Sequence, residues 1–304
     1  MPNAVESNAQ DSAVYLIDAS VYIFRAYFSL PDSLQNSAGE PINAVQGFAG
    51  FLQGLLSQTQ AEQVAVAFDE SLTTSFRNEL YPAYKANREP APEDLKRQFA
   101  TCRALAEAMG LSCFSSDRYE ADDLIATLAA RAQARQQPVV IVSRDKDLAQ
   151  LLTEHDRLWD FAGDVWMDIA AVTQKFGVPP AQMLDYQALV GDAVDNIPGI
   201  KGVGPKAAVA LLEYFGNLEA VFDRVDEVVA LPIRGAKRLH VLLKDGREMA
   251  LLSRELCRMV LDAPLPATAN DLSRGPVTSA GISTFCDNYG LGAGLRQRLL
   301  SLVD

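Results

Sequence analysis

Three short apolar runs that each end on an aspartate constrain the fold of this chain more than any other feature. The runs are VYLID at residues 14–18, AVAFD at 65–69 and PVVIVSRD at 138–145. Apolar runs of this length are typical of buried strands. Helical patterns lie between them, and strands that alternate with helices predict a parallel sheet covered on both faces. Ligands of such sheets collect beyond the carboxyl ends of the strands, so we expect Asp18, Asp69 and Asp145 at one site.

The expected helices divide the chain into two parts. In the first part, apolar spacing and end signals place them at residues 20–30, 43–58, 94–109 and 120–135. The strand signal disappears after Pro179 and Pro180. Beyond that point the expected helices lie at about 181–190, 205–215, 235–246 and 247–260. We therefore predict an α/β core over residues 14–180 and a helical lobe over 181–304, of which residues 261–304 carry no readable motif.

The composition is that of an ordinary soluble globular protein. Of the 304 residues, 49% are hydrophobic and 22% are charged, which is sufficient for a large core and one smaller domain. Charged residues interrupt the longest apolar stretches, which excludes a spanning helix. Residues 1–13 are polar, lack Lys and Arg, and predict a disordered tail rather than a signal peptide. We therefore expect a cytoplasmic protein that does not associate with membranes.

Cysteine and histidine usage narrows the possible chemistry. The four cysteines are Cys102, Cys113, Cys257 and Cys286. They form no CxxC pair and have no nearby histidine, which fits reduced packing thiols and argues against zinc. The two histidines, His155 and His240, are far apart and lack a neighbouring Ser or Cys motif, so a catalytic triad is poorly supported. If the chain is an enzyme, carboxylates must carry its chemistry.

Six further carboxylates accompany the three strand-end aspartates. They are Glu120, Asp122 and Asp123 in YEADD, Asp147 in SRDKD, and Asp192 and Asp195 in GDAVDN. The YEADD run opens a helix, where the macrodipole favours acids, so one or two of its acids would need no functional explanation. Three acids within four residues, followed by acids beside tight turns, indicate a site instead.

The chemistry of converging carboxylates points to metal ions. Such groups raise one another's pKa unless cations neutralise them. Ligand sets made only of oxygen select Mg²⁺ or Mn²⁺ over zinc. Two such ions about 4 Å apart can activate water on one side of a phosphodiester and stabilise the leaving oxygen on the other. The nine acids therefore predict phosphodiester hydrolysis without histidine.

The net charge of −12 at first sight opposes nucleic-acid binding. Nine of the 39 acidic residues belong to the predicted site, which leaves −3 for the rest of the chain before any metal is counted. The distribution of charge then matters more than its sum. Residues 234–258 carry seven Lys or Arg against three acids, although a run of this kind is most simply a solvated helix face.

Several of these motifs follow one another over residues 14 to about 260: Asp18, Asp69, YEADD, DKD, GDxxDN and GIKGVGPK. In this order and spacing they resemble the 5′-nuclease and flap endonuclease family, especially the nuclease domain of bacterial DNA polymerase I-type enzymes. The resemblance implies a PIN-like core with a helical arch at about 71–98. It also implies a C-terminal helix-three-turn-helix lobe with a helix-hairpin-helix at about 190–215. All nine acids would then hold two or more Mg²⁺ or Mn²⁺ ions, the later acids forming a second or outer site.

Residues 71–93 are polar, aromatic and proline-bearing, and the resemblance makes them part of the arch through which a single-stranded 5′ end passes. Lys85 and Arg88 lie three residues apart, so in a helix they would share one side and stabilise charge on the scissile phosphate. Tyr84 could stack on an unpaired base. The alternative is a loop with ordinary surface charges.

Two further arginines are candidate DNA contacts by resemblance alone. Arg77 belongs to an FR pair that is similar to the family, and Arg25 lies seven residues after Asp18 on the first expected helix. Judged by periodicity, Arg25 is simply an exposed arginine.

GIKGVGPKAA at residues 199–208 predicts a tight glycine turn that runs into a helix. Free backbone N–H groups there, together with the residues Lys201, Gly202, Gly204 and Lys206, predict an anion site for a duplex phosphate. The run does not match a nucleotide-binding P-loop, because no GK[ST] follows, and an ordinary helix-turn-helix connection would need no ligand. By resemblance, the turn would also coordinate K⁺ through backbone carbonyls near Gly199, Ile200 and Val203.

We therefore predict a metal-dependent 5′-3′ exonuclease and structure-specific 5′-flap endonuclease. Its expected substrate is DNA with a 5′ flap, a nick or a 5′ single-stranded end, cut to leave 5′-phosphates during replication and repair. We expect a monomer. Two alternatives stay open: a catalytically silent, structure-specific DNA-binding protein, and a single-strand RNase with a related acidic core.

Overall fold

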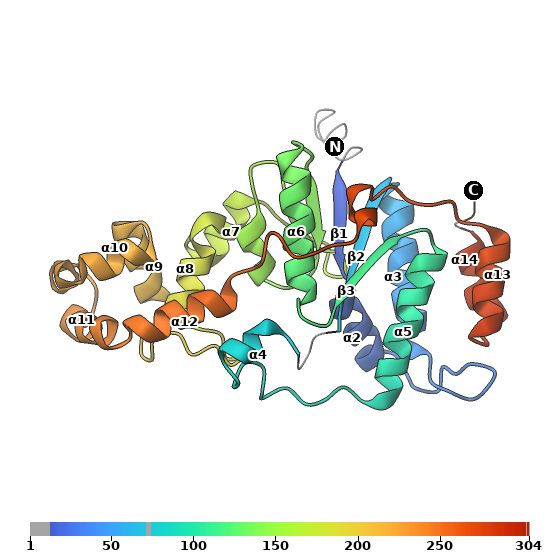
Figure 1. Cartoon of the computed structure of the whole chain (residues 1–304), viewed down its shortest axis with the longest axis horizontal. Helices are drawn as coiled ribbons and strands as arrows, with labels where there is room; N and C mark the ends of the chain where they lie inside the picture. Colours follow the sequence, from blue (N-terminus) through green and yellow to red (C-terminus); the bar gives the residue numbers. More distant parts are fainter. Residues whose placement is uncertain (1–12, 71–73, 302, 304) are drawn as a thin grey trace.

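The computed structural model describes residues 13–70, 74–301 and 303. It contains an α/β core and a helical lobe that extends from one side of the core (Figure 1). The predicted tail at residues 1–13 lies outside the described residues except for Ala13, which is buried. Among the described residues, we find no helix with the length and apolar character needed to cross a membrane.

A six-stranded sheet forms the centre of the core. Its strands are β1 (Val14–Asp18), β2 (Gln63–Asp69), β3 (Ser112–Ser116), β4 (Val139–Val142), β5 (Arg157–Asp160) and β6 (Val165–Met167). They lie in the order β3-β2-β1-β4-β5-β6, and only β6 runs antiparallel to its neighbour. Leu16 of β1 is paired with Ala65 of β2 and with Ile141 of β4. The strand order therefore reverses between β1 and β4, which is where open α/β sheets bind ligands.

Helices cover both faces of the sheet, so the predicted α/β class is confirmed. One face packs against α6 (Ala121–Ala134), and the other packs against α2 (Ala19–Ser29), α3 (Asn43–Thr59) and α5 (Glu93–Ala108). Alternate residues of β1 serve the two cores: Leu16 packs toward α6, whereas Tyr15 and Ile17 pack toward α2 and α3. This double burial explains why the strands read as continuous apolar runs.

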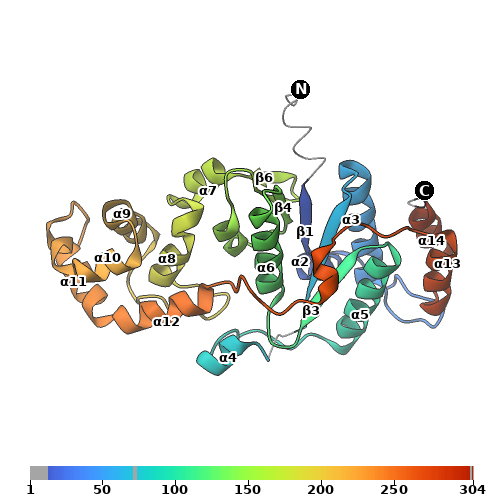
Figure 2. The ribbon, with the colours of Figure 1, turned by 45° about the horizontal axis from the view of Figure 1, so that its top comes forward.

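The helical lobe continues the core that surrounds α6. Its helices are α7 (Ile169–Phe176), α8 (Pro180–Val190), α9 (Pro205–Phe215), α10 (Leu218–Asp223), α11 (Ala236–Asp245) and α12 (Arg247–Cys257). Leu189, Leu211 and Phe222 belong to the same apolar cluster as Leu124 of α6. Both views show α12 lying along the lower side of the lobe, beside α8 (Figures 1 and 2). The lobe and the core therefore share one continuous apolar cluster.

The predicted extent of the helical lobe, residues 181–304, needs correction. Beyond Val260 the chain returns to the α/β core and ends in α13 (Ser279–Asn288) and α14 (Ala293–Leu300), next to α5 and α3 (Figure 2). The apolar side chains of Ile282 and Phe285 are buried in the cluster on that face of the sheet. Burial of these side chains accounts for the position of the segment against the core.

The predicted helical arch at residues 71–98 also differs from the structure. Residues 71–73 lie outside the described residues, and the following chain forms one short helix, α4 (Phe76–Leu80), before α5 begins at Glu93. Between these helices the chain folds as turns, and Lys85 has a left-handed backbone with a φ of 53°. The argument that Lys85 and Arg88 share one side of a helix is therefore wrong.

Candidate metal centre

The predicted strand-end aspartates lie at the carboxyl edge of the sheet. Asp18 ends β1 and Asp69 ends β2, while Asp145 follows β4 across the switch point. The hydroxyl of Ser143 donates a hydrogen bond of 2.9 Å to Asp18 Oδ2 and so orients that carboxylate. The backbone N–H of Asp147 donates to Asp145 Oδ1 at 2.8 Å. The short turn after β4 therefore places two acids and holds a third.

The acids at this edge repel one another. Burial and then the charges of Asp145 and Asp69 raise the pKa of Asp18 to about 7. Burial and the charge of Asp145 raise the pKa of Asp147 to about 8. The pKa values of Asp122 and Asp145 are raised as well, first by burial and then by neighbouring carboxylates. Bound cations would neutralise carboxylates that repel one another in this way, and oxygen donors suit Mg²⁺ or Mn²⁺.

The arrangement of these acids is open. Across residues 13–70 and 74–301, no three His, Cys, Asp or Glu side chains are gathered closely enough to hold a metal ion between them. Mg²⁺ usually keeps several of its water molecules and takes only one or two carboxylates directly. The edge therefore suits a hydrated ion better than a closed structural site.

Cationic side chains lie among the acids. Lys85 Nζ is 2.9 Å from Glu120 Oε2 and 3.8 Å from Asp195 Oδ2, and Arg88 forms an ion pair with Asp195. Burial alone would raise the pKa of Glu120, but the charges of Lys85 and Arg77 lower it. The site therefore contains two groups of acids. Asp18 and Asp147 repel neighbouring carboxylates, whereas Glu120 and Asp195 are paired with cations.

Sequence reasoning missed Lys146 and Ser143. Lys146 forms an ion pair with Asp192. Burial raises the pKa of that carboxylate, but the hydrogen bond and charge of Lys146, together with the N–H groups of Val194 and Asp195, lower it overall. Gln187 of α8 donates to Asp147 Oδ1. Lys146 and Ser143 both lie inside the SRDKD run, and their position beside its two aspartates is the sequence signal that points to them.

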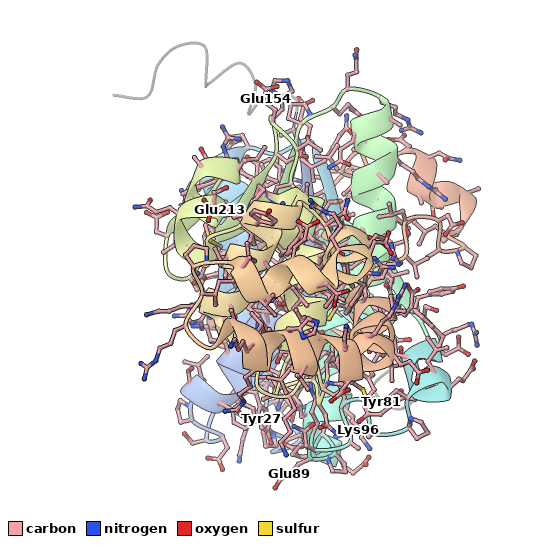
Figure 3. All side chains as sticks on the ribbon, turned by 90° about the vertical axis from the view of Figure 1, so that its left-hand side faces the viewer. Tyr27, Tyr81, Glu89, Lys96, Glu154 and Glu213 are labelled. Carbon is pink, nitrogen blue, oxygen red and sulfur yellow. The ribbon has the colours of Figure 1, made fainter. Side chains whose placement is uncertain are left out.

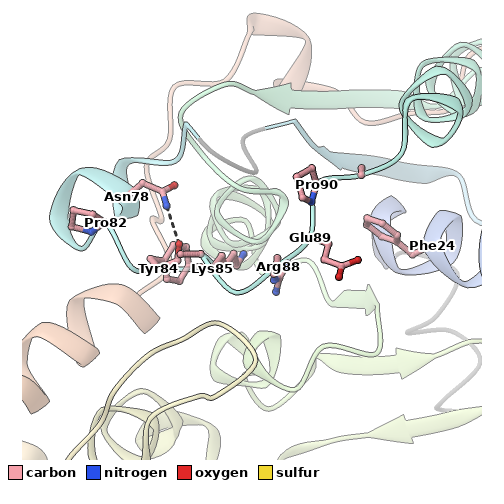
Figure 4. A pocket seen from close by; sticks show the side chains of 10 residues that line it. Phe24, Asn78, Pro82, Tyr84, Lys85, Arg88, Glu89 and Pro90 are labelled. Atoms are coloured by element: carbon pink, nitrogen blue, oxygen red, sulfur yellow. Dashed lines mark hydrogen bonds between the residues drawn. The ribbon is translucent and has the colours of Figure 1, made fainter.

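Tyr84 does not present an open ring for base stacking. Its side chain is only 3% exposed, and its hydroxyl donates to Glu120 Oε2 at 3.0 Å. The expected stacking role of Tyr84 is therefore not supported in this structure. Figure 4 shows Tyr84, Lys85 and Arg88 in sequence along one wall of a cavity of about 640 Å³. Phe24 of α2 also lines this cavity, whereas Asp145, Asp147, Asp192 and Asp195 line a second cavity of about 460 Å³, and Arg88 borders both.

Asp123 and Arg77 need correction, because the structure pairs them with each other. Arg77 Nη1 and Nη2 lie 2.7 and 2.8 Å from the two carboxylate oxygens of Asp123. Asp123 is 0% exposed and Arg77 is 3% exposed. Because both carboxylate oxygens are engaged by Arg77 and the guanidinium is paired with Asp123, neither side chain is free in this structure for the role predicted for it. The sequence held a sign of this, because Glu120 and Asp123 form a capping box at the start of α6.

Arg25 is exposed on α2, as periodicity indicated. It lines a cavity of about 330 Å³ whose other walls include Tyr22, Phe51 and Phe161. Its side chain is therefore accessible, and a contact with DNA stays a prediction.

The glycine turn has the backbone geometry that its sequence suggests. Gly199 has a φ of 56°, and a Cβ atom there would lie 2.3 Å from the backbone nitrogen of Gly191. Only glycine fits this approach. The N–H of Gly199 donates to Ser253 Oγ of α12 at 3.0 Å, which ties the turn to the lobe.

The lysines and the backbone groups predicted to bind ions follow Gly199 in the turn. Lys201 and Lys206 are exposed, Gly202 has a φ of 96°, and Gly204 precedes the first residue of α9. The Ile200 carbonyl accepts a hydrogen bond from Val203 N at 2.9 Å. The turn can offer backbone N–H groups and lysines to an anion, while the K⁺ site stays a prediction.

The basic stretch at residues 234–258 is neutralised in part, because three of its seven basic side chains, those of Lys244, Arg254 and Arg258, form ion pairs. Lys244 pairs with Asp226 at 2.7 Å, and Arg258 pairs with Glu255 at 3.2 Å. These pairs support the solvated-face interpretation of that stretch. Figure 3 looks onto the helical lobe, with Glu213 in its upper part and with Tyr81, Lys96 and Glu89 toward the bottom of the view.

The chain thus combines an acidic carboxyl edge on a mainly parallel sheet with a helical lobe in which a glycine turn connects α8 to α9. Residues 13–177 match the family model described as "5′-3′ exonuclease, N-terminal resolvase-like domain". Residues 178–280 match the model described as "5′-3′ exonuclease, C-terminal SAM fold". The chain belongs to the 5′-3′ exonuclease family.

Relatives of two lengths share this sequence. The chain is 41% identical over 282 residues to DNA polymerase I of Rhizobium leguminosarum, covering 87% of the chain and 27% of the relative. It is 31% identical over 284 residues to a 5′-3′ exonuclease of Buchnera aphidicola subsp. Acyrthosiphon pisum, covering 93% of the chain and 99% of the relative. The chain thus spans about a quarter of the DNA polymerase I relatives and nearly all of the shorter one.

Two solved structures share the fold. T5 5′-exonuclease with bound divalent metal ions superposes with a TM-score of 0.66 at 20% identity, covering 95% of this chain and 98% of that chain. The catalytic core of Rad2 in complex with DNA substrate gives a TM-score of 0.65 at 16% identity, covering 100% and 96%. The predicted family and fold are therefore confirmed.

Proposed function

We propose that this protein hydrolyses DNA phosphodiesters as a Mg²⁺- or Mn²⁺-dependent 5′-3′ exonuclease and 5′-flap endonuclease. The observation that carries the proposal is a group of partly buried carboxylates that raise one another's pKa, beside Lys85 and Arg88 at one sheet edge. The cut would fall near the junction of a 5′ single strand and a duplex and would leave a 5′-phosphate. Relatives named 5′-3′ exonuclease and DNA polymerase I support this assignment.

The proposed metal set is the predicted set without Asp123. It comprises Asp18, Asp69, Glu120, Asp122, Asp145 and Asp147 near the sheet edge, with Asp192 and Asp195 as an outer pair. Two or more bound ions would supply Lewis acidity and a nucleophilic water at neutral pH. The protein's own part is to hold the acids in position, through the hydrogen bonds from Ser143 and from the N–H of Asp147.

The cations would bind the substrate phosphate. Lys85 and Arg88 both contact Asp195, so a phosphate at this place would meet two positive groups. Fixed positive groups at developing charge stabilise a transition state more than a solvated ground state. Tyr84 would act indirectly, by holding Glu120 through its hydroxyl.

The glycine turn would hold the duplex part of the substrate. Lys201, Lys206 and the N–H groups around Gly202 and Gly204 would bind a backbone phosphate. The carbonyls near Gly199, Ile200 and Val203 are the proposed K⁺ ligands. We further propose a cytoplasmic monomer that removes primers or flaps on DNA with a 5′ flap, nick or single-stranded end, during replication and repair.

A substrate panel tests the proposal. A 5′ flap, a nicked duplex, a blunt duplex and single-stranded DNA and RNA are each incubated with Mg²⁺ or Mn²⁺. We expect the flap and nick to be cut by the wild type, and Asp145→Ala to lose the activity. Glu154→Ala is the control, because Glu154 is exposed and lies at the opposite end of the view from Tyr81 and Glu89, which belong to the segment between α4 and α5 (Figure 3).

Three outcomes would reject the proposal. Equal cleavage by the wild type and Asp145→Ala would show that the acidic edge is not the active centre. Binding of flap DNA without cleavage in either metal would favour the silent DNA-binding protein. A preference for single-stranded RNA would favour the RNase.

A further inference from the structure

Two loops that carry proposed site residues are joined by asparagine side chains. Asn87 Nδ2 donates to the backbone carbonyls of Ala193 at 3.2 Å and Val194 at 3.3 Å. In the opposite direction, Asn196 Nδ2 donates to the carbonyl of Ala83 at 2.6 Å. We call these three hydrogen bonds the asparagine latch. Each amide reaches from its own loop to the backbone of the other.

The latch surrounds one backbone hydrogen bond, made by a residue with an unfavourable backbone conformation. The N–H of Lys85 donates to the carbonyl of Asp195 at 3.0 Å, between the two asparagine contacts. Lys85 has a φ of 53° and Asn196 has a φ of 56°. Asparagine tolerates this left-handed region, whereas lysine is disfavoured there, so its surroundings must hold it. Strained residues of this kind concentrate at functional sites.

The contact matters because of what each loop carries. Residues 83–88 hold Lys85 and Arg88, which meet Glu120 and Asp195. Residues 192–196 hold Asp192 and Asp195 and lead directly into the glycine turn. The latch therefore joins the segment with the phosphate-binding cations to the loop with the outer acids and the duplex grip.

We propose that Asn87 and Asn196 are positioning residues of the nuclease reaction. They act through Lys85 and Asp195, by fixing the distance between the cations and the acids across the two loops. The same link ties the cations to the glycine turn, so it also sets how far from the bound duplex the cut falls. This inference rests on the proposed nuclease function.

Three variants and one matched control test the proposal. Asn87→Ala removes one side of the latch. Asn196→Gly removes the other amide while keeping the left-handed backbone at no steric cost. The third variant combines both changes. Gln182→Ala is the control, because Gln182 also donates to two backbone carbonyls, those of Leu212 at 3.3 Å and Gly216 at 2.8 Å, away from the acids.

Cleavage of a 5′-flap DNA is followed with enzyme in excess over a range of enzyme concentrations. We expect the maximal rate to fall about tenfold to a hundredfold in each latch variant, since misplacement by about 1 Å has such an effect. The half-saturating enzyme concentration should stay unchanged. The double variant should lose less than the product of the single losses, and its cuts should spread to neighbouring nucleotides. Gln182→Ala should match the wild type in rate and cut position.

Hydrogen exchange of the Lys85 backbone amide gives a readout without cleavage. Its protection should decrease in the latch variants and stay unchanged in Gln182→Ala. If the wild type cuts no substrate, the proposed function fails, while the exchange data still decide whether the latch orders Lys85. If exchange is unchanged, or if only the half-saturating concentration moves while the maximal rate and cut position stay the same, the positioning role is overturned.

Discussion

The guanidinium of Arg77 and the carboxylate of Asp123 form a bidentate pair of 2.7 and 2.8 Å that is closed to solvent. Arg77 also donates to the carbonyls of Leu256 and Arg258, and Asp123 Oδ1 accepts from the N–H of Val260. The pair thus joins α4, the start of α6 and the end of α12. The pair therefore attaches the segment that carries Lys85 and Arg88 to both the α/β core and the helical lobe.

Asp123→Ala is expected to lower the free energy of unfolding by about 3–5 kcal/mol, because the charge of Arg77 is left buried without its partner. Urea denaturation measures this effect. The variant should still gain stability from Mg²⁺, because Asp123 is not in the proposed metal set. If the variant is as stable as the wild type without metal but gains no stability from Mg²⁺, Asp123 is a metal ligand after all.

Metal binding should stabilise the protein by mass action. Mg²⁺ at about 100 times its Kd adds about 2.7 kcal/mol to the free energy of unfolding. Asp145→Asn should remove most of this gain, and it should not lower the stability measured in EDTA, because it relieves repulsion with Asp18. Melting curves with and without Mg²⁺ measure both effects. An unchanged Mg²⁺ effect in Asp145→Asn would argue against this edge as the metal centre.

Stability without metal should depend on pH through Asp18 and Asp147. Their folded pKa values of about 7 and about 8 lie above the value of about 4 for an unfolded aspartate. Their contribution is present in full below about pH 4 and is lost as the pH rises through the folded pKa values. In EDTA, the melting temperature should therefore be higher at about pH 6 than at about pH 8. Mg²⁺ should stabilise more at the higher pH, because protons compete for the same oxygens. A metal-free melting temperature that rises toward pH 8 would contradict this.

Arg88→Ala should lower the maximal cleavage rate by about 10²- to 10³-fold, as loss of one charge-stabilising group does in other enzymes. Stability should change little, because Arg88 is partly exposed. Single-turnover kinetics and melting curves measure the two effects. Lys96→Ala is the control, since Lys96 is an exposed cation of α5 paired with Glu93. Equal rates for both variants would show that Arg88 does not act on the phosphate.

Lys206→Ala should weaken duplex binding without changing its sequence preference. Removal of one phosphate contact lowers the slope of log K against log salt by about 0.9. Titration of duplex DNA at several salt concentrations measures the slope. Lys244→Ala provides the comparison, because Lys244 already pairs with Asp226. If the slope changes equally in both variants, the glycine turn is not a specific phosphate site.

Secondary structure was predictable where local patterns were strong. The expected helices at 43–58 and 205–215 correspond to α3 and α9 within one residue, and VYLID is β1. The strand β3, with the sequence SCFSS, escaped prediction because its polar residues lack an apolar period. It is a strand because β2 offers it a hydrogen-bonding edge, which is a tertiary cause.

The sequence by itself determined the class of fold and the gathering of acids at one edge, because strand ends and helix starts follow from local periodicity. Only the tertiary structure decided which acids are available. In YEADD, Asp122 and Asp123 are adjacent, but successive helical residues point in different directions, so Asp123 meets Arg77 while Asp122 meets the charges of Asp145 and Asp18. The partner of a buried charge is set by packing between segments far apart in the chain, and local sequence patterns do not encode that packing.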